Sequence, residues 1–235
     1  MHHWTSAKEV AWVGDEALVG PIRAVRLSFH GLGMNGTYTP GDDDRRYGAS
    51  GILTVFPYYG PWSWMNREAR AMVDEVVDAV YAEYALPDAT PLLLTGGSMG
   101  GGSALLYARY ARHTPAGVYA NCPVCDYTYH FTERPDLPRT FYHAYGHYAG
   151  DWQAILQEHS PLHQAAAMPD VPYFILHGDA DTSVNKAAHS DRLVPALRAR
   201  GLQVTYREVP GMGHGGPIPE DVMTEVDGFI LGFAK

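Results

Sequence analysis

The run Gly96-Gly97-Ser98-Met99-Gly100 has the residue types and spacing that suit nucleophilic catalysis by a serine. It follows the pattern G-x-S-x-G, which presents a serine hydroxyl on a sharp turn between a strand and a helix. Such a turn lets a base, a substrate and backbone N–H donors reach the hydroxyl together. A Cβ atom at Gly96 or Gly100 is expected to collide with a neighbouring strand or helix. The pattern therefore predicts Ser98 as a nucleophile.

Two further candidate residues follow in the order that such a site requires. Asp181 comes shortly after a strand-like run that ends at His177, and His214 lies among glycines near the C-terminus. We expect His214 to take the proton of Ser98 and to deliver it later to the departing alcohol. Asp181 would hold the imidazole in the right tautomer, whereas Asp179 is the alternative carboxylate, able to cap or turn the same loop.

The tetrahedral intermediate of acyl transfer needs two N–H donors for its oxyanion. The N–H group of Met99, the residue after the nucleophile, is the first expected donor. The second should come from the loop after an early strand, where Gly31-Leu32-Gly33 can point an N–H group inward. We favour Leu32, with Gly33 as the alternative. His30 and His177, each before a glycine at a strand end, are expected to be hydrogen-bonded structural residues.

Strands and helices alternate along the sequence around these residues. Residues 22–30 alternate apolar and polar side chains, which predicts a strand with one face partly exposed. Residues 51–57 are continuously apolar, which is typical of a strand buried on both faces. Residues 66–86 repeat apolar side chains at helical spacing, with Asn66 as N-cap and with Arg70 on the polar face. Further strands are expected at 92–95, 117–121, 173–177 and 203–209, and further helices at 101–112, 186–200 and 219–234.

This alternation predicts an α/β fold with a mostly parallel sheet and helices on both faces. Functional groups then gather at the carboxyl ends of the strands. The regular pattern breaks down from Cys122 to about Pro161, where we expect an irregular, aromatic-rich insertion. With 235 residues, of which 46% are hydrophobic, the chain can bury one substantial core, so we expect a single domain over residues 1–235.

The composition of the chain limits the kinds of partner that we expect it to bind. The formal net charge of −9, with 17 basic and 26 acidic residues, argues against a nucleic-acid surface. No stretch is apolar for long enough to span a membrane, and the N-terminus lacks the pattern of a secretion signal. We therefore expect a cytoplasmic enzyme with a small-molecule substrate. The sequence leaves the oligomeric state open.

No metal or other cofactor is expected. Cys122 and Cys125 are the two cysteines of the chain, and a zinc knuckle would need a second ligand pair, so we expect buried or half-buried thiols. Two histidine pairs have the i, i+4 spacing of ligands on one helix face, but neither carries the glutamate of H-E-x-x-H. These pairs are His143 with His147 and His159 with His163.

The chain resembles the α/β-hydrolases, and among them the catalytic domain of the prolyl oligopeptidase group and its short esterase relatives. The resemblance covers nearly the whole chain. It depends on His30-Gly31, on the run from Gly96 to Gly100, on Ser160-Pro161-Leu162, on His177-Gly178 followed by Asp181, and on Gly213-His214-Gly215. It implies a catalytic triad of Ser98, Asp181 and His214 with a backbone oxyanion hole. Peptidases of the group usually carry a large propeller domain, for which these residues leave no room, so we expect an esterase.

Substrate specificity is expected to come from two aromatic stretches. The first follows the strand at 51–57, and the second lies in the insertion at about 122–161, which commonly forms a lid in this fold. Aromatic faces with polar edges suit sugar rings or phenolic acids. The candidate substrate-binding residues are Tyr58, Tyr59, Trp62, Trp64, Tyr127 and Tyr142. For most of the aromatic residues, the alternative is that they pack the insertion against the sheet.

We therefore predict a serine esterase that cleaves short-chain or aromatic acyl esters, such as acetyl or feruloyl esters of carbohydrates. A peptidase acting on short peptides would use the same triad. A lyase or a perhydrolase could also keep it. A non-catalytic binding protein would normally have lost a triad member, and this chain has all three.

Overall fold

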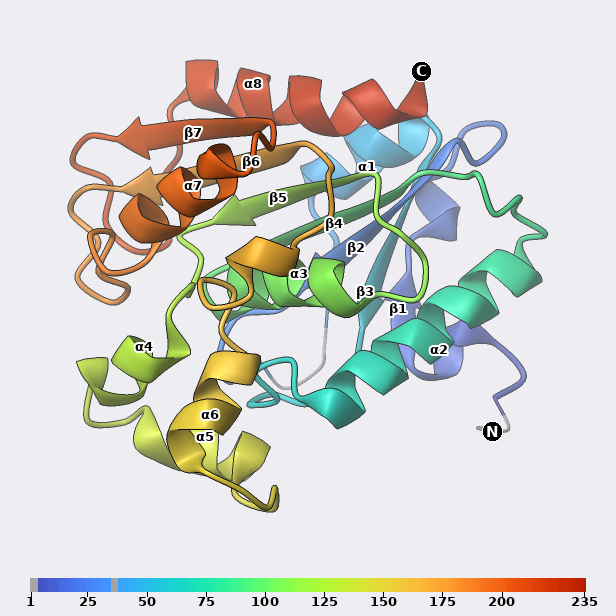
Figure 1. Cartoon of the computed structure of the whole chain (residues 1–235). Coiled ribbons are helices and arrows are strands. Elements are labelled where there is room, and N and C mark those ends of the chain that lie inside the picture. The colour runs from blue at the N-terminus through green and yellow to red at the C-terminus, as the bar shows by residue number, and fades with distance from the viewer. Residues whose placement is uncertain (1–3, 35–37) are drawn as a thin grey trace.

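The computed structural model describes residues 4–34 and 38–235. Residues 1–3, part of the N-terminal stretch in which we found no secretion signal, lie outside the described residues. Seven strands form one sheet in the order β1-β3-β2-β4-β5-β6-β7 (Figure 1). The strands are β1 (Ala11–Val13), β2 (Ala24–Phe29), β3 (Ile52–Pro57), β4 (Leu92–Gly97), β5 (Gly117–Asn121), β6 (Tyr173–Gly178) and β7 (Val204–Val209). Only β1 pairs antiparallel, with β3, among these strands.

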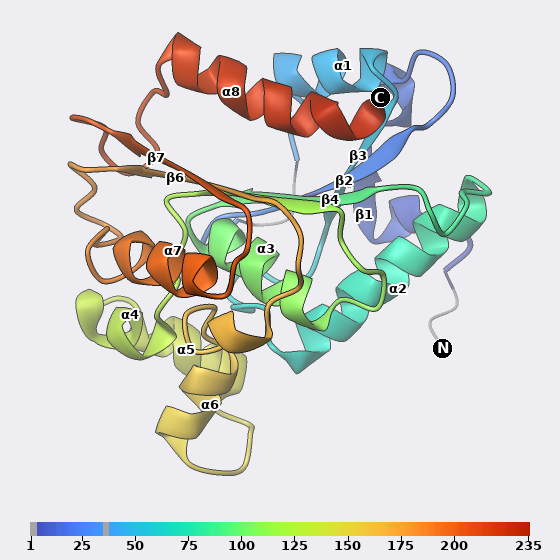
Figure 2. The ribbon, with the colours of Figure 1, turned by 45° about the horizontal axis from the view of Figure 1, so that its top comes forward.

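Helices cover both faces of the sheet, as Figure 2 shows. One face carries α1 (Asp42–Ala49) and α8 (Glu220–Leu231), and the other carries α2 (Arg67–Glu83), α3 (Met99–Tyr110) and α7 (Ser190–Ala199). Short 3₁₀ turns lie at Ala7–Glu9, Asp15–Ala17, Ala165–Ala167 and Gly232–Ala234. The predicted α/β architecture with a mostly parallel sheet is confirmed. Among the described residues, no helix combines the length and the apolar character that a membrane crossing requires.

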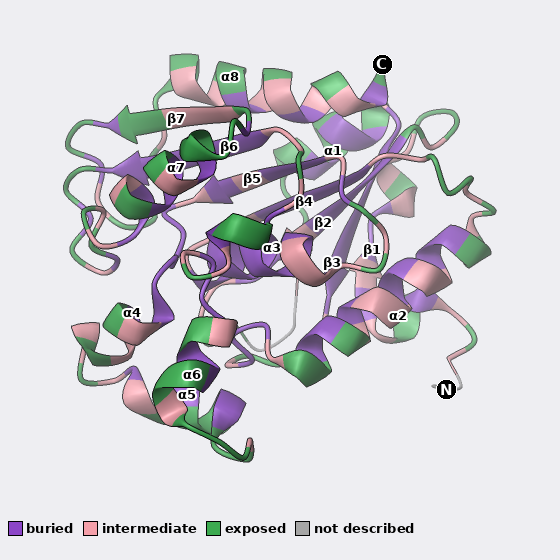
Figure 3. Ribbon diagram, viewed as in Figure 1, coloured by how far each residue is buried: buried purple, intermediate pink, exposed green. Residues whose placement is uncertain are grey.

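The core lies on both faces of the central strands, which are buried along most of their length (Figure 3). Every residue of β3 is buried, as its apolar run predicted. Helix α2 begins where expected, because the side chain of Asn66 accepts a hydrogen bond from the N–H of Ala69. Arg70 is a correction: it is only 8% exposed, with its guanidinium 4.0 Å from the centre of the Tyr110 ring.

The expected exposed face of β2 is also a correction. β2 lies inside the sheet between β3 and β4, helices cover both faces of the sheet, and five of its six residues are buried. Arg26 is buried there, 2.6 Å from the carboxylate of Asp44 and 4.7 Å from the centre of the Tyr47 ring. Arg26, one of the polar residues in the alternating pattern of β2, is therefore part of a buried ion pair and does not face solvent.

The insertion is more regular than its sequence predicted. It contains three short helices, α4 (Tyr127–Glu133), α5 (Pro138–Tyr145) and α6 (Trp152–Glu158), which lie beyond the layer of α2, α3 and α7 (Figure 2). The insertion is tied to the start of α2. The guanidinium of Arg67 lies 2.5 Å from the carboxylate of Glu158, and the ring of Trp64 stacks on Phe141 with centroids 4.3 Å apart.

Candidate active site

Ser98 occupies a strained turn between β4 and α3. Its φ of 58° and ψ of −125° lie outside the regions that serine normally adopts, which is typical of a nucleophile elbow. A Cβ atom on Gly96 would lie 2.3 Å from the carbonyl oxygen of Gly100. A Cβ atom on Gly100 would lie 2.2 Å from the carbonyl oxygen of Phe29. The predicted close approach of the backbones on both sides of the serine is confirmed.

We expect Gly100→Ala to destabilise the fold, because the new methyl group meets rigid backbone rather than a movable side chain. Overpacking of this kind typically costs about 1–3 kcal/mol. Gly228→Ala in α8 is the matched control, because a Cβ atom there meets nothing within 4 Å. Alanine at this helical position should stabilise by about 0.5–1 kcal/mol. Thermal unfolding of both variants tests this, and equal melting temperatures would contradict it.

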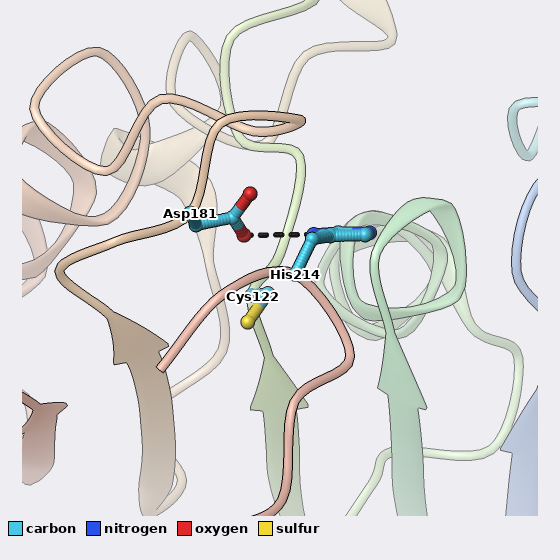
Figure 4. A group of neighbouring side chains, drawn as sticks. All are labelled: Cys122, Asp181 and His214. Atoms are coloured by element: carbon cyan, nitrogen blue, oxygen red, sulfur yellow. Dashed lines mark hydrogen bonds and ion pairs between the residues drawn. The ribbon is translucent and has the colours of Figure 1, made fainter. Parts of the chain in front are cut away.

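The three predicted catalytic side chains come together at the carboxyl ends of β4 and β6. The Nε2 atom of His214 lies 2.9 Å from the Oγ atom of Ser98. Its Nδ1 atom lies 2.7 Å from Oδ2 of Asp181, and Figure 4 shows this contact with Cys122 beside it. Gly178 lets the loop of His214 approach, since a Cβ atom there would lie 2.0 Å from the carbonyl oxygen of Met212.

Asp181 is fixed by backbone donors. Its Oδ1 atom accepts the N–H groups of Ser183 at 2.8 Å and Val184 at 2.9 Å. Burial alone would raise the pKa of Asp181, but hydrogen bonds from His177, His214 and these N–H groups hold it well below its usual range. Asp179, by contrast, accepts the N–H of Gly211 at 2.6 Å. The structure thus brings Asp181, and not Asp179, to the imidazole of His214.

The electrostatics around His214 favour its charged form. The hydrogen bond to Asp181, followed by the contact with Cys122, raises the pKa of His214 to about 9, against the opposing effect of burial. The carboxylate therefore stabilises the imidazolium that would form when the ring takes a proton from Ser98.

Ser98 and His214 line a cavity of about 340 Å³. Its other lining residues are Gly31, Leu32, Trp64, His130, Arg134 and Val184. His130, Arg134 and Val184 were not among the predicted site residues. A larger hollow of about 490 Å³ beside β1 contains none of the three candidate catalytic residues, so the chemistry points to the smaller cavity.

The chain matches the sequence model of the prolyl oligopeptidase family over residues 69–235. The chain belongs to this family. It is a family of serine hydrolases within the α/β-hydrolase superfamily, as the resemblance of the motifs implied. No curated protein matches the chain by sequence.

Solved structures share the fold of this prolyl oligopeptidase family chain at low sequence identity. The acylaminoacyl peptidase of Pyrococcus horikoshii has a TM-score of 0.73 and 17% identity, and the match covers 95% of this chain and 38% of that one. A puromycin-hydrolysing peptidase of Mycobacterium tuberculosis has a TM-score of 0.73 and 19% identity, and the match covers 92% of this chain and 34% of that one. Esterase B of Lactobacillus rhamnosis has a TM-score of 0.69 and 15% identity, and the match covers 92% of this chain and 78% of that one. The chain thus spans about a third of the length of these peptidases.

In this member of the prolyl oligopeptidase family, the N–H groups predicted to bind the oxyanion differ in whether they already donate a hydrogen bond. Met99 is the first residue of α3, where backbone N–H groups have no partner within the helix. The N–H of Gly33 already donates to the carbonyl oxygen of Pro61 at 3.0 Å. No hydrogen bond among the described residues uses the N–H of Leu32, which lines the cavity. This arrangement favours Leu32 over Gly33.

Of the six predicted substrate-binding aromatic residues, Trp64 alone lines the cavity with Ser98. It is otherwise buried, and its indole N–H donates to the hydroxyl of Thr140 at 2.9 Å. Tyr59 and Tyr127 are corrections, because both pack in the core: Tyr59 stacks on His30 with centroids 4.2 Å apart, and Tyr127 packs edge-on against Trp64.

The other three aromatic candidates lie outside that cavity. Tyr58 lines a separate hollow, and Trp62 packs edge-on against His143 with centroids 5.6 Å apart. Tyr142 is 56% exposed and stacks on Trp152 at 4.7 Å. The stacking of Tyr142 on Trp152 shows that rings of the insertion pack against one another, as the alternative reading of the sequence expected.

Both cysteines and His177 are buried, in agreement with the sequence analysis. Cys122 and Cys125 are free and buried, and burial raises the pKa of Cys125 well above its ordinary value. His177 is buried, with Nδ1 2.7 Å from the hydroxyl of Ser190. The spaced histidine pairs do not share a helix face, because α5 ends before His147 and α6 ends before His159.

Proposed function

We propose that the chain is a serine esterase that works through an acyl-enzyme. The observation that carries the proposal is the pair of contacts at His214, 2.9 Å to the hydroxyl of Ser98 and 2.7 Å to the carboxylate of Asp181, beside a cavity that can hold an acyl group. The hydroxyl of Ser98 attacks the ester carbonyl while Nε2 of His214 accepts its proton. The same proton then passes to the departing alcohol.

The N–H groups of Leu32 and Met99 bind the oxyanion of the tetrahedral intermediate in this proposal. Each such donor typically contributes about 3–4 kcal/mol to the transition state. In the second half-reaction a water molecule gives a proton to His214 and attacks the acyl-enzyme, which releases the acid and restores the hydroxyl of Ser98. Asp181 keeps the imidazole oriented through both steps.

The size of the cavity supports the substrate class that we propose. A volume of about 340 Å³ beside the ring of Trp64 suits a short-chain or a single-ring aromatic acyl group. Acetyl and feruloyl esters of carbohydrates are the substrates that we propose to screen first. A lyase or a perhydrolase would also keep the triad, and the absence of free acid among the products would identify one of them.

Peptidase activity is the second candidate, which the match to the prolyl oligopeptidase family and the solved acylaminoacyl peptidase favour. An ester and an anilide of the same N-blocked amino acid separate the two candidates, because the acyl groups are identical and only the leaving group differs. Selective cleavage of the anilide, or of a short peptide, would overturn the esterase proposal.

Hydrolysis should rise with pH because His214 must be unprotonated to accept the proton of Ser98. With the pKa of His214 raised to about 9, most of the rings are protonated at neutral pH, and kcat/KM for a simple ester should increase until the pH passes about 9. A pH profile at fixed ionic strength measures this. A midpoint near 6.5, the ordinary value for histidine, would show that Asp181 does not act on the ring in the free enzyme.

A fluorophosphonate followed by peptide mapping tests the mechanism itself. We expect the label on Ser98, in the peptide that spans the elbow between β4 and α3. Labelling of a different serine, with Ser98 unmodified in the active enzyme, would contradict the assignment.

A further inference from the structure

His130, Glu133 and His189 form a buried polar cluster behind the catalytic cavity. His130 and Glu133 lie on α4, and His189 precedes α7. The Oε2 atom of Glu133 lies 2.5 Å from Nδ1 of His130 and 3.0 Å from Nε2 of His189. Its Oε1 atom accepts the N–H of Asn185 at 2.6 Å. One carboxylate thus joins the insertion to the loop that follows β6.

The hydrogen bonds of His189 argue against a metal ion in this cluster. Its Nδ1 atom accepts the backbone N–H groups of Cys125 and Asp126, both at 3.0 Å, so it carries no proton. The proton of the neutral ring must then lie on Nε2, which donates to Glu133. A metal ion could bind Nε2 only if the ring lost this proton as well, which would leave an imidazolate anion with no proton on either nitrogen. The donor set therefore fits a hydrogen-bond network and not a cation site.

The same reasoning fixes the protons of His130. Its Nδ1 atom faces a carboxylate oxygen, so Nδ1 is the donor. Burial lowers the pKa of His130 to about 4, in spite of the opposing hydrogen bond to Glu133, so the ring is neutral at pH 7. Hydrogen bonds to His130, His189 and Asn185 in turn hold the pKa of Glu133 below its usual range, although burial would raise it. Nε2 of His130 is left as a bare acceptor.

His130 lines the cavity that holds Ser98 and His214. The side chain of His130 is only 2% exposed, and no hydrogen bond among the described residues uses its Nε2 atom. Its ring packs edge-on against Trp64 with centroids 5.4 Å apart, and both rings line the cavity. Nε2 is not one of the fully buried polar atoms that lack a partner, so it keeps some accessible surface in the empty cavity. A substrate that fills the cavity would cover this acceptor, and covering it without offering a donor is unfavourable. A substrate that supplies a donor therefore gains affinity over one that does not.

We propose that His130 selects acyl groups that carry a neutral hydrogen-bond donor, such as a hydroxyl group, at the end that enters the cavity. The inference rests on the proposed function, because it names the acyl class that the same site prefers. The leaving group must lie next to His214, which protonates it, and the acyl group takes the side walled by Trp64 and His130. Glu133 is a positioning residue that keeps the proton of His130 on Nδ1.

Matched pairs of esters that differ by one hydroxyl group test the proposal. The pairs are N-acetyl-tyrosine with N-acetyl-phenylalanine ethyl ester, methyl 4-coumarate with methyl cinnamate, and N-acetyl-serine with N-acetyl-alanine ethyl ester, so that the donor reaches different depths. We expect kcat/KM to favour the hydroxylated member of at least one pair by about tenfold or more, because the other member would cover the acceptor without pairing it. Equal rates within every pair of the wild-type enzyme would overturn the proposal.

Substitution of the ring identifies the residue responsible. His130→Phe keeps an aromatic ring but removes the acceptor, so the ratio of kcat/KM within the preferred pair should fall to about one or below. His130→Leu should give the same result if the first variant does not fold, and fluorophosphonate labelling of Ser98 reports which variant is folded. His113→Phe is the matched control, because His113 pairs with Asp78 outside the cavity and should leave the ratio unchanged.

Two further outcomes separate this inference from the proposed function. If the ratio persists in both His130 variants while Ser98 is still labelled, the inference is overturned. It is also overturned, under the same condition, if the enzyme prefers a hydroxyl group on the alcohol side, as in 4-hydroxybenzyl acetate compared with benzyl acetate. Loss of labelling together with no hydrolysis of any ester in the wild-type enzyme overturns the proposed function, and the inference with it.

Discussion

Replacing Ser98 with alanine should reduce kcat for ester hydrolysis about a million-fold, close to the loss that follows removal of a triad serine. The hydroxyl lies 2.9 Å from Nε2 of His214, and no other hydroxyl among the described residues contacts that nitrogen. Alanine also removes the atom that would carry the acyl group. Kinetics with an aryl acetate and labelling with a fluorophosphonate measure the effect together.

Ser50→Ala is a suitable control for this variant. Ser50 is the residue that caps the end of α1, and among the described residues its hydroxyl donates a hydrogen bond to the carbonyl oxygen of Arg46 alone. We expect the control to retain wild-type kcat and the label on Ser98. Substantial hydrolysis by Ser98→Ala, with no wild-type contamination, would rule out the acyl-enzyme mechanism.

Asp181→Asn should lower kcat about ten-thousand-fold, as removal of the triad carboxylate charge does elsewhere. The amide could still accept the N–H groups of Ser183 and Val184, so the loop should keep its shape. It would no longer stabilise the imidazolium of His214 or require the proton to lie on Nδ1. The loss should therefore appear in kcat, with little change in thermal unfolding.

Asp179→Asn is the matched control for Asp181, since it lies two residues away in the same loop. Its carboxylate accepts the N–H of Gly211, and an asparagine oxygen can do the same. We expect activity within a few-fold of wild type. Equal losses in the two variants would show that the loop, rather than the charge of Asp181, supports the chemistry.

The sequence predicted the central elements well because their patterns are set by burial. The apolar run of β3 and the helical spacing of α2 correspond to elements that the structure contains. Besides the three short helices of the insertion, one strand and one helix were missed. β1 has three residues and no room for a pattern, and α1 begins with three aspartates and exposes most of its length, so neither carries an apolar repeat.

Site residues were predictable where the backbone imposes a residue type. The elbow requires glycine at two positions, and that requirement is visible in the sequence. Cavity walls carry no such signal, because the burial of Tyr127 and the access to His130 depend on how the short helices of the insertion pack. The spacing of His130 and Glu133, one helical turn apart on α4, was a local clue to their pairing.

The carboxylate of Glu133 bears on how this enzyme can be re-engineered. It receives hydrogen bonds from α4 and from residues 185 and 189, which belong to the loop that also supplies Asp181. A chimera that takes residues 122–161 from a relative without a glutamate at the position of Glu133 would leave Asn185 and His189 without their acceptor. Swapping the segment together with residues 181–189 should therefore preserve turnover, whereas exchanging either segment alone should impair it.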